Sequence, residues 1–196
     1  MHKKHSFFLF CLTVLALSCE PSDTNETQRD FSCIQLFDVN GQALGTHGNC
    51  SSLDDWGAIP LTPGERALLD FSDTVSLAGT ASSSAIKNLF CFPIPVRIND
   101  PLFLSIRSAV GNEPVKVKFV FVDETLTPLA QYALQTTTNK VFAVPISAGT
   151  YHTGQYYRVY YRVSVAGNEN LFEGRGNFLV CKTNIVNGLS IEMDCP

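Results

Sequence analysis

Apolar and polar residues alternate along many short stretches of this chain, most clearly over residues 156–165. In that stretch, YYRVYYRVSV, the odd-numbered positions form one continuous apolar face. Residues 115–122 repeat the pattern, with Lys116 and Lys118 on the other side. Because successive side chains of a strand point to opposite faces, both stretches are predicted to be strands with one buried face.

Turn residues separate further runs of this kind. Short strands are predicted at 74–78, 87–92, 102–108, 129–134, 141–146 and 171–181, with Pro93 ending the second. A hairpin over about 33–46 turns at Asn40-Gly41, and a capping box at Thr62-Pro63-Gly64-Glu65 begins a helix that runs to about Asp70. The pattern predicts an all-β, antiparallel β-sandwich with immunoglobulin-like layering and one short helix, formed by residues 31–196 as a single domain.

The two strands that flank residues 167–168 have alternative registers. A two-residue loop sets three pairs of residues opposite one another: Tyr161 and Gly174, Val159 and Gly176, and Arg162 and Glu173. A four-residue loop instead sets Arg162 opposite Arg175. The first register is favoured because it pairs opposite charges and sets large groups against glycine.

The N-terminus has the features of an export signal. Residues 1–6 are basic, residues 7–17 are apolar, and Ser18 precedes Cys19. Residues 15–19, LALSC, resemble the lipobox of bacterial lipoproteins, although an ordinary secretory signal is the alternative. The resemblance implies cleavage after residue 18, acyl chains on Cys19 and a membrane-anchored mature protein.

Residues 19–30 are polar and are expected to form a disordered tether. Glu20, Asp23 and Glu26 are similar to the acidic export signals of Bacteroidota surface lipoproteins. That resemblance implies a protein of the outer membrane, displayed on the cell surface rather than on the periplasmic face.

The net charge of the chain narrows its possible partners, and its cysteines indicate which disulfides can form. Removal of residues 1–18 takes away Lys3 and Lys4 and no acidic residue, so the net charge changes from −4 to −6, which argues against nucleic acid as a partner. An exported chain can form disulfides, and the favoured pairs are Cys33 with Cys50 and Cys181 with Cys195. Cys91 is then left as a buried free thiol.

No metal or cofactor is expected. The chain contains no CxxC pair, and its mature part has only His47 and His152 as histidines. The sequence Asp38-x-Asn40-Gly41 resembles the start of a calcium loop but lacks the later acidic ligand.

No catalytic motif is present, so the chain is predicted not to be an enzyme. The carboxylate pairs best placed for a hydrolase are Asp54 with Asp55 and Asp70 with Asp73, but loop and capping roles are favoured for them.

The outward face of residues 156–162 is the candidate binding surface, formed by Tyr156, Arg158, Tyr160 and Arg162. Tyrosine and arginine are enriched where proteins bind partners, although a solvated sheet face is the alternative. The first hypothesis is therefore a non-enzymatic, lipid-anchored module that binds a protein or glycan. The alternatives are a periplasmic assembly or scaffold component, and a hydrolase that uses the loop carboxylates.

Overall fold

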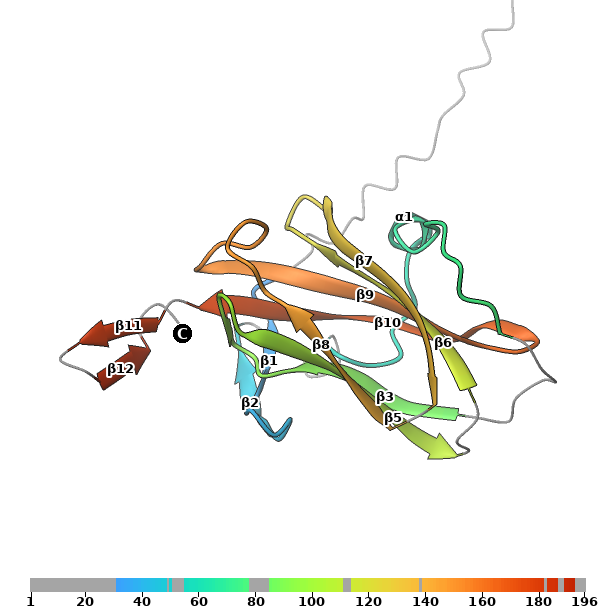
Figure 1. The fold of residues 1–196 in the computed structure, drawn as a ribbon, viewed down its shortest axis with the longest axis horizontal. Coiled ribbons are helices and arrows are strands. Elements are labelled where there is room, and N and C mark those ends of the chain that lie inside the picture. Colours follow the sequence, from blue (N-terminus) through green and yellow to red (C-terminus); the bar gives the residue numbers. More distant parts are fainter. Residues whose placement is uncertain are drawn as a thin grey trace, which may run out of the picture.

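The computed structural model describes residues 31–48, 50, 55–77, 85–110, 114–137, 139–181, 183–186 and 189–192. Two β-sheets pack face to face in it (Figure 1). The five-stranded sheet has the order β4 (Val96–Arg97), β10 (Asn168–Cys181), β9 (Gln155–Val165), β6 (Pro114–Val122) and β7 (Pro128–Thr137). The three-stranded sheet has the order β3 (Ala85–Phe92), β5 (Pro101–Val110) and β8 (Lys140–Pro145).

Three smaller elements complete the described chain. They are the hairpin β1 (Ile34–Phe37) with β2 (Ala43–His47), the helix α1 (Pro63–Ala67), and the hairpin β11 (Thr183–Val186) with β12 (Leu189–Glu192). In the described part of the chain no helix has the length and apolar character needed to cross a membrane.

The strand order confirms immunoglobulin-like layering. The order β3-β5-β8 corresponds to strands A, B and E of that fold, and β10-β9-β6-β7 corresponds to G, F, C and C′. The fold also has a tyrosine corner, because the hydroxyl of Tyr157 at the start of β9 accepts the backbone N–H of His152 at 2.8 Å. The predicted fold class is therefore correct.

The core lies between the two sheets, where the alternating patterns predicted it. The inward residues of β6 and β9 are at most 3% exposed: Val115, Val117, Phe119, Phe121, Tyr157, Val159, Tyr161, Val163 and Val165. Leu102, Leu104 and Ile106 of β5 meet them from the other sheet. Burial of these side chains supplies the main driving force for closing the sandwich.

The favoured register of β9 and β10 is confirmed. Tyr161 lies opposite Gly174, Val159 opposite Gly176, and Arg162 opposite Glu173. The turn itself is one residue earlier than predicted, since Val165 pairs with Asn168. An irregularity between Asn168 and Phe172 then restores the predicted register.

The N-terminal hairpin is also as predicted. Gly41 adopts a φ of +76°, which a residue without a β-carbon tolerates best. The carboxylate of Asp38 accepts the backbone N–H groups of Asn40 at 2.9 Å and Gln42 at 2.8 Å, so its role is to close this turn. A disulfide joins Cys33 and Cys50 beyond the two strands, and Cys91 is a buried free thiol.

Two predictions about the segment after the hairpin are wrong. The helix ends at Ala67 rather than near Asp70, and residues 74–77 do not form a strand, while Ala78 lies outside the described residues. In a strand, the backbone carbonyl groups of this segment would accept hydrogen bonds from a neighbouring strand. Here they accept hydrogen bonds from lysine side chains. The ammonium group of Lys116 donates to Val75 O at 2.9 Å, and that of Lys118 donates to Phe71 O.

Candidate functional site

Residues 55–77, here called the strap, first run along β10 and then cross the outer face of the five-stranded sheet. Leu61 and Leu69 of the strap pack with Phe31 against Val120, Val122 and Tyr160 of the sheet, as a second apolar cluster. Tyr160 is 0% exposed and Arg158 is 3% exposed, while Tyr156 and Arg162 are half-buried. The predicted exposed binding face of these four residues is therefore wrong, because the strap lies on it.

Arg158 has a structural role beneath Phe31. Its guanidinium group lies 4.1 Å from the centroid of the Phe31 ring, and its Nε donates to Asn177 Oδ1 at 2.6 Å. The side-chain amide of Asn177 in turn donates to the carbonyl oxygen of Cys33 at 2.8 Å. Arg158 thus joins β9 and β10 to the start of the N-terminal hairpin, and burial lowers its pKa.

The candidate hydrolase carboxylates are held in separate contacts. Asp55 accepts the backbone N–H groups of Gln35 at 2.7 Å and Asn177, and burial raises its pKa to about 7. Asp54 lies outside the described residues. Asp55 therefore joins the strap to β1 and β10. These contacts indicate a structural role for Asp55 rather than a catalytic one.

Asp70 and Asp73 each pair with cations of the sheet. Asp70 lies 3.1 Å from Arg162, and Asp73 lies 2.7 Å from Lys116 and 3.3 Å from Lys118. The hydrogen bond from Lys116 is the main cause that holds the pKa of Asp73 below its ordinary value. Among the described residues, no group of three or more histidine, cysteine or acidic side chains could hold a metal ion.

Glu65 completes the predicted capping box and also has a buried ionic role. It accepts the backbone N–H of Thr62 at 2.8 Å, and the Thr62 side chain accepts the N–H of Glu65 in return. The same carboxylate lies 3.1 Å from Arg175 and accepts the hydroxyl proton of Tyr160 at 3.0 Å. The strap is therefore fixed to the sheet through the first turn of α1.

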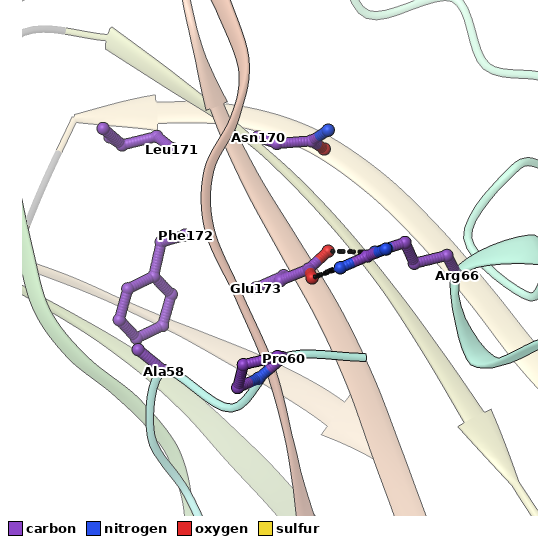
Figure 2. A pocket seen from close by; sticks show the side chains of 7 residues that line it. All are labelled: Ala58, Pro60, Arg66, Asn170, Leu171, Phe172 and Glu173. Atoms are coloured by element: carbon purple, nitrogen blue, oxygen red, sulfur yellow. Dashed lines mark hydrogen bonds and ion pairs between the residues drawn. The ribbon is translucent and has the colours of Figure 1, made fainter. Parts of the chain in front are cut away.

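An open groove of about 500 Å³ lies between the strap and the first half of β10 (Figure 2). Seven residues line it: Ala58, Pro60, Arg66, Asn170, Leu171, Phe172 and Glu173. The strap follows β10 at this point, since Trp56 N–H donates to Arg175 O at 3.0 Å and Ile59 N–H donates to Glu173 O at 3.1 Å. One wall of the groove is therefore held by backbone hydrogen bonds.

A charged pair crosses the groove. Nε and Nη2 of Arg66 donate to Glu173, with a shortest distance of 2.6 Å, and Leu61 N–H donates to the same carboxylate. The hydrogen bond from Arg66 is the main cause that lowers the pKa of Glu173. Because Glu173 neutralises Arg66, the pair can offer hydrogen bonds to a ligand without attracting a strong counter-charge.

Two further lining residues project from opposite sides of β10: Phe172 from the core-facing side and Asn170 from the side of Glu173 (Figure 2). Phe172 is half-buried, and its ring stacks on Tyr161 with centroids 5.9 Å apart. Asn170 is exposed, and its amide offers two donor hydrogens and an acceptor oxygen. The polar groups of Arg66, Glu173 and Asn170 therefore lie together on one side of β10, and the Phe172 ring lies on the other.

The alternation of polar and apolar residues does not single out these groove residues. It correctly sets Glu173 opposite Arg162, but the hydrogen bonds of the Glu173 carboxylate go to Arg66 on the strap. The available signal was the break in alternation over residues 168–171, where β10 departs from regular pairing with β9.

Comparisons with known proteins give only a partial structural match. No family model and no curated protein matches this chain. Two solved structures of a glycosyl hydrolase family 2 member from Bacteroides cellulosilyticus are similar to part of it, at 13% and 15% identity. They cover 52% and 55% of this chain, with TM-scores of 0.37 and 0.38, and this chain spans only 16% and 17% of theirs. This weak similarity carries no argument about function.

Proposed function

We propose that this protein is a lipid-anchored, non-catalytic module of the outer membrane whose groove binds a short neutral glycan. The observation that carries the proposal is the neutralised pair of Arg66 and Glu173 beside the exposed amide of Asn170. Acyl chains on Cys19 would hold the domain at the membrane through residues 19–30.

The chemistry of the groove supports a neutral glycan. A sugar presents hydroxyl groups around its edge and C–H groups on its faces. Guanidinium, carboxylate and amide groups are planar and can hydrogen-bond to adjacent hydroxyls, while Pro60 offers apolar contact beside Glu173, and Leu171 and Phe172 offer it across the strand. An anionic sugar is disfavoured in this groove because Glu173 lies at its centre.

The state of Glu173 supports binding rather than hydrolysis. Glycoside hydrolysis ordinarily needs two carboxyl groups, one of them with a raised pKa so that it can donate a proton. Among the described residues, Glu173 is the one carboxylate that lines the groove, and its pKa is lowered. The described residues of the groove therefore do not supply the pair of groups that such a reaction requires.

The proposal is tested with the mature chain carrying Cys19→Ser, which removes the site of lipidation. An array of neutral oligosaccharides identifies ligands, and calorimetry measures their affinity. Asn170→Ala and Arg66→Ala should each weaken binding about tenfold, because each removes hydrogen bonds worth roughly 1.5 kcal/mol. Both side chains are exposed, so thermal unfolding should change little.

Gln131→Ala is the matched control, since Gln131 is an exposed polar residue of β7 and does not line the groove. Its affinity should equal that of the parent chain. The glycan assignment fails if no neutral oligosaccharide binds, or if the Asn170 and Arg66 variants bind as tightly as the control.

Anchoring is tested separately, by protease access to the domain on intact and lysed cells. Cleavage on intact cells would support surface display, and protection until lysis would place the domain inside the envelope. A Cys19→Ala variant should leave the membrane fraction, and its retention there would contradict lipidation.

A further inference from the structure

The strand β7 forms one edge of the five-stranded sheet. It has 10 residues, and in the described part of the chain it pairs with β6 and with no other strand. The backbone N–H and C=O groups of a strand point alternately to its two sides, so about half of those in β7 point away from β6. This row of groups is a template on which a further strand can pair.

β7 lacks the features that protect the other edges of the two sheets. Natural edge strands are ordinarily short, or carry charged residues, prolines or bulges along their length. At the opposite edge of the same sheet β4 has 2 residues, and the edge strands β3 and β8 contain Lys87 and Lys140. β7 has the sequence PLAQYALQTT, without one charged residue, and its proline and the irregularity of its pairing both lie near its start.

The side chains along this edge are suited to cover by another strand. Tyr132 and Leu134 lie opposite the inward residues of β6 and pack against the core, while Ala133 faces outward. All three are half-buried, and Gln131 is exposed. A strand added beside β7 would supply neighbours to both rows, which is how strands of a sheet stabilise one another.

Charges beyond the two ends of β7 indicate which strand fits there. The turn before β7 carries Asp123 and Glu124, and Lys140 begins the next strand. Glu124 and Lys140 are exposed, and neither forms an ion pair with another described residue. If β7 pairs antiparallel with β7 of a second copy, the start of each strand lies beside the end of the other. The acidic turn of each copy then lies toward Lys140 of the other, and opposite charges meet at both ends.

We infer that two copies of this protein dimerise through antiparallel β7 strands, across a two-fold axis near Tyr132 in the middle of the strand. The interface is self-complementary, because the same strand and the same end charges supply both sides. It joins the two five-stranded sheets into one continuous sheet. Parallel pairing is disfavoured, since it sets the acidic turns of the two copies side by side.

The paired edge lies away from the groove. β10, which forms one wall of the groove, is separated from β7 by β9 and β6. Dimerisation therefore leaves both grooves open, and the two-fold axis places them on one side of the joined sheet. This inference goes beyond the proposed function and rests on different residues, so that either can fail while the other holds.

The test measures the oligomeric state of the mature chain with Cys19→Ser, by sedimentation velocity at increasing protein concentration. The parent chain should show a monomer–dimer equilibrium. Gln131→Lys sets two like charges near the axis and should weaken dimerisation about tenfold. Thr153→Lys is the matched control, because it adds the same charge at an exposed neutral residue outside the strands, and it should dimerise like the parent.

Reversal of the end charges tests the antiparallel arrangement. Glu124→Lys and Lys140→Glu should each weaken the dimer about fivefold at low salt, because like charges then meet at both ends. The double variant restores opposite charges at both ends and should dimerise like the parent. A parent chain that stays monomeric at every concentration, a dimer of unchanged strength in Gln131→Lys, or a double variant in which the two losses add would each overturn the inference.

Discussion

The indole ring of Trp56 lies directly on Gly176, in the space that a β-carbon at this position would occupy. Trp56 is 7% exposed, and its ring is parallel to that of Tyr161 within 2°, with centroids 6.3 Å apart. The Gly57 carbonyl lies against Gly174 in the same way. Glycine at these two positions of β10 lets the strap approach the strand closely enough to hydrogen-bond with it.

Gly176→Ala should therefore destabilise the domain by about 1–3 kcal/mol, because a buried tryptophan must move to admit the methyl group. Urea unfolding measures this change. Gly64→Ala is the control: it lies in α1, nothing lies within 4 Å of an added β-carbon, and stability should rise by less than about 1 kcal/mol. Equal losses at the two positions would contradict the close packing of Trp56.

The parts of this fold that sequence predicts well depend on local patterns. Alternation in 156–165 fixes which residues of β9 face the core, and opposite charges at Arg162 and Glu173 select the register with β10. The capping box at Thr62 and Glu65 and the turn at Gly41 are equally local. Each can be read from residues that lie close together in the chain.

The strap could not be predicted in this way, because its contacts with the five-stranded sheet join residues 41 to 122 positions apart. Arg158 and Tyr160 look like outward polar residues until residues 55–77 cover them. One signal did exist: Val120 and Val122 make the outer side of β6 apolar as well. Strands that are apolar on both sides are typical of sheets covered on both faces. The groove exists only because the strap is there.

The pair of Glu65 and Arg175 should contribute to holding the strap in place. Glu65→Gln keeps the capping box, since glutamine also serves at this position, but it removes the charge beside Arg175. Because Glu65 is 1% exposed, unfolding free energy should fall by about 1.5–3 kcal/mol, the range for a hydrogen bond to a charged group.

Thr62→Ala serves as the comparison for Glu65, because it removes the capping oxygen and leaves the ion pair. It should cost about 1 kcal/mol. Denaturant unfolding of both variants and of the double variant checks the assignment. No loss in Glu65→Gln would mean that the buried pair contributes nothing to stability.

The disulfide of Cys33 and Cys50 should stabilise the hairpin more than any single contact within it. It closes a loop of 17 residues, for which chain entropy gives about 3 kcal/mol. In the double variant Cys33→Ser and Cys50→Ser, amide hydrogen exchange should accelerate over residues 34–47. Cys91→Ala, which removes a free thiol, should leave exchange in that hairpin unchanged; an equal acceleration there would point to general loosening of the domain.

Asp55 should make the domain less stable as the pH rises from 5 to 7. Burial raises its folded pKa from 3.8 to about 7, so the folded state holds a proton over a range in which the unfolded state has lost it. Stability then falls with rising pH by at most about 1.4 kcal/mol per pH unit, and the fall ends above pH 7. Asp73 and Glu173 act in the opposite sense. Their pKa values are lowered in the folded state, so their ionised forms stabilise it, and that stability is lost only as the pH falls below about 4.

Stability should therefore be greatest between about pH 4 and 5. Asp55→Asn should abolish the slope between pH 5 and 7. The asparagine variant will be less stable than the parent at every pH, because the NH2 of its side-chain amide faces one of the backbone N–H groups of Gln35 and Asn177. The change of stability with pH, rather than its absolute value, is therefore the quantity to compare. Asp123→Asn is the control, because the pKa of Asp123 is lowered and its removal should leave the slope intact. A parent chain whose stability is flat or rising between pH 5 and 7 would show that Asp55 stays ionised between its two backbone donors.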